Sequence, residues 1–342
     1  MGRTVPSKLT AWLRAELGSG VWIPGLTAGA LISLMAVFFA LSIGSLIFSG
    51  DLAPYLANGL GIALVTQTIV LIVISLGSSV AGVTGSLQDT CGVILAAMAA
   101  ALFGSLEAAG AEERLATVLV AIAVTTVLTG AFLWAVGFFR LGGLVRYVPY
   151  PVVGGFLAGS GWLLVRGSLS VMAGVPFTYE GLQAALQPER LVLWLPGALL
   201  AVVLLVAARR FRHFLVGPAI LVGAFALFYL ILPIVGLSVD EAAARGLLLA
   251  APSPAPEAAA AVKLTWQSPV PALLAAVNWP AILGQAGNIA IVLVLAVVSL
   301  LLNVSGIELA IRRDTDLNRE LRVAGAANLL SGLAVGRWAF SR

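Results

Sequence analysis

The sequence has few charged residues for its length. Of its 342 residues, 10% are Asp, Glu, Lys or Arg, whereas 61% are hydrophobic. About a quarter of the residues of a soluble domain are charged, because its surface must face water. The composition therefore excludes an ordinary soluble domain and predicts that most of the surface faces a lipid bilayer.

Cysteine and histidine are also scarce. The chain has one of each, Cys91 and His213, which excludes a disulfide framework and a cluster of metal ligands of the zinc type. We therefore expect no metal and no cofactor. The net charge is only +4 and comes from short basic clusters between apolar runs, so we expect no binding to nucleic acid.

Long apolar runs recur along the whole chain, and we predict that they form membrane-spanning helices, about nine in all, since a helix needs about 20 apolar residues to cross a bilayer. Barrel strands alternate polar and apolar residues, and these runs do not. The fold class that we predict is an all-α integral membrane protein. The expected spans are Ile23–Phe48, Gly59–Val80, Asp89–Gly104, Leu115–Phe138, Tyr147–Met172, Leu191–Ala208, Gly217–Val235, Ala281–Asn303 and, more weakly, Leu321–Val335.

The basic residues predict the orientation of the chain, because cytoplasmic loops are enriched in Lys and Arg. Lys8 and Arg14 precede the first run, and later basic clusters alternate with acidic ones from loop to loop. We therefore predict a multi-pass protein of the cell inner (plasma) membrane with a cytoplasmic N-terminus. Residues 1–20 lack the short apolar core and cleavage site of a signal peptide, so we expect them to be retained.

Two distant runs have similar ends, which indicates an internal repeat. Pro24 follows a tryptophan at the start of the first run, as Pro280 does at the start of the eighth, and the distance from Pro24 to Ser49 equals that from Pro280 to Ser305. An odd number of predicted crossings separates the two runs, so they point in opposite directions, as in an inverted repeat. Chance is the alternative, since these residue types are common at helix ends.

Three segments, Tyr150–Trp162, Leu301–Leu309 and Asp316–Asn328, together resemble the bacterial sulfate permease (SulP) family, which is related to solute carrier family 26. The resemblance runs from about Trp22 to Gly336. It implies a seven-plus-seven inverted-repeat transporter fold, with a core domain and a gate domain. It also implies elevator-like transport of an inorganic or small organic anion, with sulfate as the first candidate and bicarbonate or a dicarboxylate as the others.

On this resemblance the chain is truncated after about nine spans. We expect a cytoplasmic N-terminal segment (1–20), a first seven-span repeat (21–236) with core spans 1–4 and gate spans 5–7, an extracytoplasmic loop (237–280), and the start of the second repeat (281–342). The family's tenth span and its cytoplasmic STAS domain are missing. A homodimer is also implied. The alternative is a non-transporting membrane fragment or an assembly partner for a complete subunit.

The resemblance places the anion at the start of the third span, and the residues there suit one. A helix that begins inside the membrane leaves backbone N–H groups free, and its positive dipole end attracts an anion. Family relatives resemble Gly-Pro-Gln-Asp-Thr-Pro at this point, whereas this chain differs at both prolines. Ser86 and Asp89 also have the spacing of a capping box, which is the structural alternative. The candidates for substrate binding are Gly85, Ser86, Leu87, Gln88 and Asp89.

Three further residues are candidates for the same site. Ser299 and Asn303 lie four positions apart on one helix face, where they either face the substrate or bond a neighbouring helix. Arg342 falls where the family's tenth span begins and would attract an anion there, unless it is a free terminus. Ser160 between two glycines is similar to an intramembrane serine nucleophile, but His213, the sole base, lies in a basic loop, so we do not expect an enzyme.

Overall fold

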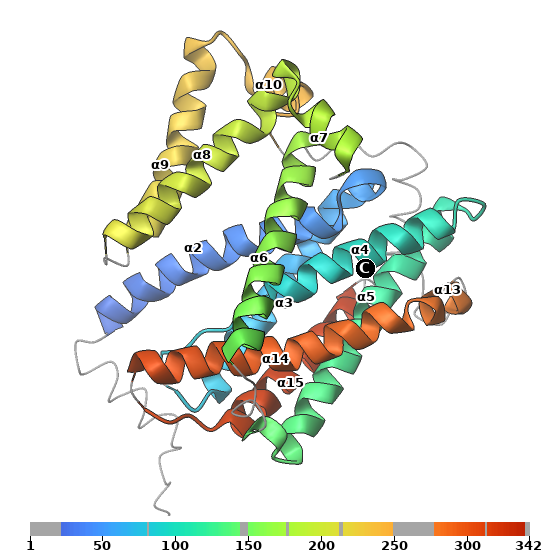
Figure 1. Cartoon of the computed structure of the whole chain (residues 1–342), viewed down its shortest axis with the longest axis vertical. Coiled ribbons are helices and arrows are strands. Elements are labelled where there is room, and N and C mark those ends of the chain that lie inside the picture. The colour runs from blue at the N-terminus through green and yellow to red at the C-terminus, as the bar shows by residue number, and fades with distance from the viewer. Residues whose placement is uncertain are drawn as a thin grey trace, which may run out of the picture.

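The computed structural model describes residues 22–80, 82–143, 150–175, 178–211, 215–248, 277–311 and 313–338. Every regular element within these ranges is a helix (Figure 1), which confirms the predicted all-α class. The short helices are η1 (Gly50–Tyr55), α7 (Tyr179–Ala185), α10 (Val239–Ala244) and α13 (Trp279–Gly284). The long ones are α2 (Trp22–Ile47), α3 (Leu56–Gly77), α4 (Asp89–Ser105), α5 (Ala111–Phe138), α6 (Tyr150–Ala173), α8 (Pro188–Arg210), α9 (Val216–Ile234), α14 (Ala286–Ile311) and α15 (Leu317–Trp338).

Helices of this length and composition confirm a membrane protein. Among the described residues, six stretches are long and apolar enough to cross a bilayer: Ala28–Ile47, Gly50–Gly77, Ala111–Phe138, Pro188–Arg210, Val216–Ile234 and Ala286–Glu308. Helix α4 and the second half of α6 are apolar but shorter. Helix α15 carries Arg319, Glu320 and Arg322 in its first turns. The count of nine spans therefore stays a prediction.

The helices pack in two groups. Helices α2, α3, α4, α5, α14 and α15 contact one another, and α6, α7, α8 and α9 lie along one side of them (Figure 1). Contacts between the groups run mainly from α6 and α9 to α2 and α4. The boundaries of the predicted core and gate domains are not fixed by this packing and stay predictions.

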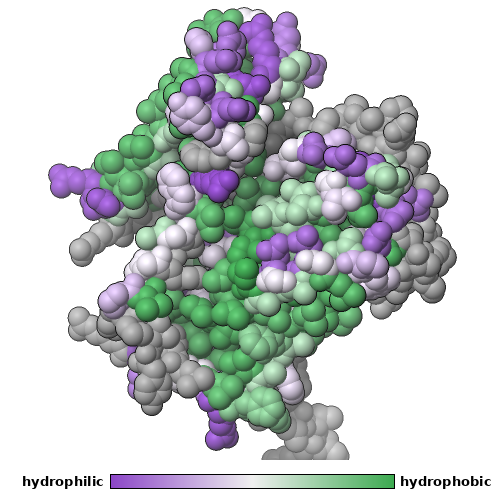
Figure 2. Space-filling view, turned by 45° about the vertical axis from the view of Figure 1, so that its right-hand side comes forward, coloured by the Kyte–Doolittle hydropathy of each residue, from purple (hydrophilic) through white to green (hydrophobic). Residues whose placement is uncertain are grey.

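Much of the outer surface is apolar (Figure 2). Helices α8 and α9 bury little of their length, because a membrane span whose neighbours are lipid needs no polar face. Large hydrophobic side chains are exposed along both, among them Leu199, Val202 and Val206 on α8 and Phe225 and Leu230 on α9. This distribution agrees with the prediction that lipid covers the chain.

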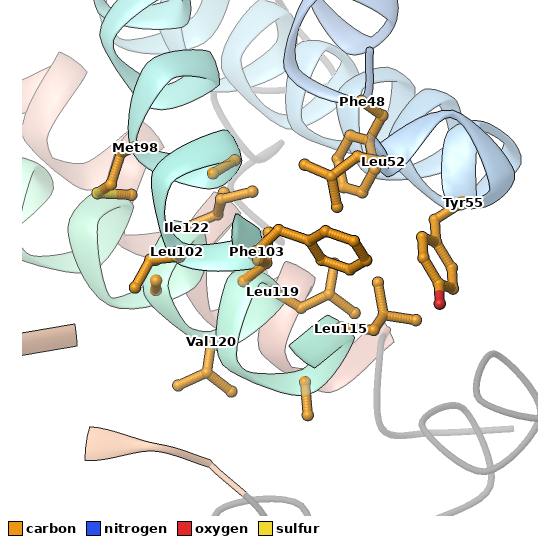
Figure 3. Close-up of a cluster of buried hydrophobic side chains, with 14 of the residues drawn as sticks. Phe48, Leu52, Tyr55, Met98, Leu102, Phe103, Leu115, Leu119, Val120 and Ile122 are labelled. Carbon is orange, nitrogen blue, oxygen red and sulfur yellow. The ribbon is translucent and has the colours of Figure 1, made fainter. Parts of the chain in front are cut away.

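A cluster of aromatic and aliphatic side chains joins η1, α4 and α5 at one end of the larger group (Figure 3). Phe103 packs edge to face against Tyr55, with ring centroids 5.8 Å apart. The guanidinium of Arg114 lies 3.8 Å from the centroid of the Phe103 ring and donates two hydrogen bonds to the Phe103 carbonyl oxygen. The cluster thus satisfies the end of α4 while it buries apolar surface.

Helix α15 is held against α5 by glycines. A Cβ atom on Gly130 would lie 2.6 Å from the backbone nitrogen of Leu329, and one on Gly325 would lie 2.6 Å from that of Trp134. Glycines let two helix backbones approach this closely. Helix α15, which is the least apolar of the long helices, is therefore fixed by shape rather than by a wide apolar face.

The similar ends of the first and eighth runs do not occupy equivalent places. Pro24 lies within α2, whereas Pro280 lies in α13, which ends before α14 begins at Ala286. Ser49 follows α2, but Ser305 lies inside α14. The Asn278 side chain accepts a hydrogen bond of 3.1 Å from the Ala281 N–H and caps the start of α13. The inverted repeat stays a prediction.

Candidate functional site

Helix α4 begins in the interior of the protein, after an extended segment. Residues 83–88 form no helix, and α4 starts at Asp89, the residue predicted from the sequence. Thr90 and Cys91, in the first turn, are 4% and 6% exposed. The N-cap residue is Gln88, whose side chain forms no capping hydrogen bond. The first turn of α4 therefore lies within the protein, where one of its backbone N–H groups, that of Thr90, donates to the Asp89 carboxylate.

Gln67 on α3 holds the extended segment in place. Its side-chain nitrogen donates a hydrogen bond of 3.1 Å to the Gly85 carbonyl oxygen, and its side-chain oxygen accepts one of 2.9 Å from the Leu87 N–H. Gln67 is 3% exposed. Gln67 is not among the residues predicted for the site.

Gly85 presses against α3 just beyond this contact. A Cβ atom at Gly85 would lie 2.7 Å from Ile74 Cγ1 and 2.9 Å from Val70 Cγ1. The side chain of any other residue would push the segment away from the helix. Gly85 is therefore required for the close fit of the segment.

Gln88 links the start of α4 to α14. Its side-chain amide donates a hydrogen bond to the hydroxyl of Ser299, which is buried. Asn303, one turn further along α14, is exposed. The structure thus brings one member of the predicted pair on α14 to the site and leaves the other at the surface.

The predicted capping box between Ser86 and Asp89 is wrong. The segment is extended up to Gln88, so Ser86 precedes the N-cap by two residues and lies too early to cap the helix. Asp89 turns back on its own helix, where its Oδ1 atom accepts hydrogen bonds from the N–H and the hydroxyl of Thr90 at 2.7 and 3.2 Å. Ser86 forms no hydrogen bond with any residue that the structure describes.

A cavity of about 160 Å³ lies on one side of this segment, between α2, α3, α4, α5, α14 and α15. Its walls are mainly apolar, and none of the described residues that line it is charged. Polar groups come from Thr66, Ser86, Gln88, Thr125, Thr126, Thr129 and Asn328.

A second space, of about 480 Å³, lies on the other side of Ser86. It is bounded by α2, by the segment from Thr84 to Ser86, and by Leu221 of α9. A third space of about 460 Å³ between α2 and α6 shares Phe39 and Ser42 with the second. Ser86 therefore lies between an inner cavity and a crevice that separates the two groups of helices.

Some candidates cannot be placed. Arg342 and His213 lie outside the described residues, and the side chain of Ser160 is not described. Among the residues that are described, no group of three or more His, Cys, Asp or Glu side chains could hold a metal ion. Glu308 has a structural role, because its carboxylate accepts hydrogen bonds from the N–H and the hydroxyl of Thr315, both of 2.8 Å.

The described part of the chain thus combines six helices that are long and apolar enough to cross a bilayer with a helix that starts beside an interior cavity. The model of the sulfate permease family matches residues 24–341. The chain therefore belongs to the sulfate permease family, which confirms the resemblance seen in the sequence. Members of this family are transporters.

One curated relative is named for a different kind of solute. A vacuolar basic amino acid transporter of Saccharomyces cerevisiae is 27% identical to this chain over 232 residues, which are 65% of this chain and 21% of the relative. The chain thus spans about a fifth of the length of that relative. No solved structure shows a significant match to the chain.

Proposed function

We propose that the chain carries a small anion across the cytoplasmic membrane by secondary active transport. The observation that supports this most is the start of α4, which lies between the inner cavity and the crevice at Ser86. Aligned peptide dipoles give a helix N-terminus about half a positive charge. Its first N–H groups have no carbonyl partner within the helix, and in α4 the Asp89 carboxylate takes only that of Thr90. A small anion is the ligand that this arrangement suits.

We assign the anion to the Ser86 hydroxyl, the Gln88 amide and the backbone around them. Asp89 has a structural role in this proposal, because its carboxylate already accepts two hydrogen bonds from Thr90. The sequence predicted Gly85 and Leu87 as ligands as well. We propose that these two residues hold the segment in place through their backbone, because the Gly85 carbonyl and the Leu87 N–H both bond the Gln67 side chain.

The proposed movement is elevator-like. The segment is bonded to α3 through Gln67 and to α14 through Ser299, so it moves with the larger group of helices. Helices α6, α8 and α9 form the other body, and the crevice separates the two. Sliding of the larger group past the smaller one would carry Ser86 from one side of the membrane to the other.

Sulfate is the first substrate that we propose, with bicarbonate and dicarboxylates next. A basic amino acid is the second candidate, because the Saccharomyces relative bears that name and no described lining residue of the inner cavity is a lysine or arginine. We further propose the inner membrane as the location, a cytoplasmic N-terminus, and a homodimer.

Uptake of labelled solutes into liposomes that contain the purified chain tests the function. Saturable uptake of sulfate, bicarbonate or a dicarboxylate, weakened by Ser86→Ala, is the expected result. Uptake of labelled arginine without any anion would replace the first candidate by the second. No flux above that of empty vesicles for any of these solutes would overturn both and leave the non-transporting membrane fragment.

A further inference from the structure

The amide of Gln67 takes the place of a neighbouring strand. In a parallel sheet, a residue on one strand lies opposite a residue on the next strand. Its N–H donates to the carbonyl of the residue before that opposite residue, and its carbonyl accepts from the N–H of the residue after it. Gln67 does both with a single side chain, since it donates to the Gly85 carbonyl and accepts from the Leu87 N–H. The residue opposite the amide is therefore Ser86.

This pairing decides which way the backbone of Ser86 faces. The N–H and C=O groups of successive residues in an extended chain point to opposite edges. Because Gly85 and Leu87 bond toward Gln67, the backbone groups of Ser86 point away from it. Ser86 lines both the inner cavity and the crevice and bonds to no described residue.

The contact is also costly to lose. Gln67 is 3% exposed, so its amide loses both of its partners within the protein if the segment moves away. A buried amide without partners is strongly disfavoured. The other hydrogen bonds that hold this region lie further from Ser86 along the chain. Gln88 bonds Ser299 on the C-terminal side of Ser86, and Ser79 bonds Glu320 on the N-terminal side.

We infer that Gln67 is a positioning residue for solute binding, which holds Ser86 and its backbone in the geometry that faces the solute. The inference rests on the proposed function, because it takes Ser86 as a ligand. Gln67 itself does not touch the solute. Its loss should weaken solute affinity more than it slows the movement of the helices.

Uptake kinetics of Gln67→Leu test this, with Thr68→Val as the matched control. Thr68 lies next to Gln67 on α3, but its hydroxyl bonds only the Leu64 carbonyl of its own helix. We expect Gln67→Leu to raise KM roughly tenfold, the effect of losing about one buried hydrogen bond, with Vmax per folded protein changed less than about twofold. Thr68→Val should leave both values unchanged. An unchanged KM, or a loss of Vmax alone, would overturn the inference.

A second measurement does not need transport. A cysteine introduced as Ser86→Cys is treated with a water-soluble thiol reagent, and its rate of modification is compared with and without Gln67→Leu. The native Cys91 is buried and bonded to the Val292 carbonyl, so it gives a low background. We expect the rate to change severalfold with Gln67→Leu and not with Thr68→Val. An equal rate in all three backgrounds would refute the positioning role even if no substrate were transported.

Discussion

Glu320 on α15 and Ser79, which follows α3, are joined by two hydrogen bonds to one oxygen. The Oε1 atom of Glu320 accepts from the N–H of Ser79 at 2.6 Å and from its hydroxyl at 2.7 Å, and it also accepts from the hydroxyl of Ser78 at 3.1 Å. Glu320 is 5% exposed. The beginning of the loop that delivers the α4 N-terminus is therefore fixed to the first turn of α15.

Replacing Glu320 should separate the effect of shape from that of charge. Glu320→Ala leaves three donors without their acceptor, and we expect it to destabilise the protein by on the order of 3 kcal/mol, since hydrogen bonds to a charged group contribute about 1.5–3 kcal/mol each and are not additive. Glu320→Gln keeps a carbonyl oxygen in the same place and should lose less than half of that. Unfolding in mixed detergent micelles measures both. Equal losses for the two variants would contradict this account.

The α14 contact gives a prediction for solute affinity. Ser299→Ala removes the acceptor of the Gln88 amide and leaves that amide unpaired beside the start of α4. We expect a rise in KM of about fivefold in liposome uptake, because the half-buried Gln88 amide loses a hydrogen bond that contributes about 1 kcal/mol. Val294→Ala, at an exposed position of the same helix, is the control and should not change KM. A normal KM in Ser299→Ala would show that the Ser299 bond does not position Gln88 for solute binding.

The helices were predictable from the sequence because a bilayer imposes a simple rule on length and apolarity. The start of α4 at Asp89 was predictable too, since Gly82 and Gly85 interrupt the apolar run before it. Gly82 has a positive φ of 84°, as a turn glycine can have.

The contacts that build the site were not predictable in the same way. Apolar runs specify where helices lie in the chain but not which faces meet. The contact between Glu320 and Ser79 could therefore not be predicted from the sequence. Gln67 did leave a signal, since an amide within an apolar span is costly unless it has a partner. Asn303 stays a prediction, because the helix spacing that groups it with Ser299 does not show where the buried face of α14 ends.

The crevice along α2 should be open to water. Ser42 lines both of its spaces, whereas Val37, on another face of the same helix, is 43% exposed and lines neither. We expect Ser42→Cys to react with a membrane-impermeant methanethiosulfonate and Val37→Cys not to react, because a thiolate forms in water but not in lipid. If a transported anion slows the reaction of Ser42→Cys with the methanethiosulfonate, the solute also passes through the crevice. Failure of both cysteines to react would show that the crevice is closed to water.

The crossing of α5 and α15 should tolerate no side chain at its closest point. Gly130→Ala places a methyl group where the Leu329 nitrogen, the Gly325 carbonyl oxygen and the Leu329 side chain all lie within 2.9 Å, and two of these atoms are backbone, which cannot rotate aside. We expect a loss of about 1–3 kcal/mol, the usual cost of overpacking. Gly161→Ala in α6 is the control: no atom lies within 4 Å of its Cβ, and alanine favours a helix over glycine by about 1 kcal/mol. In mixed micelles, the midpoint of unfolding should therefore fall for Gly130→Ala and rise for Gly161→Ala.

The crossing and the Glu320 contact should depend on each other. Because α15 carries Glu320, a separated crossing should also loosen the Ser79 contact. Gly130→Ala and Glu320→Ala together should therefore lower the free energy of unfolding by less than the sum of the two single effects.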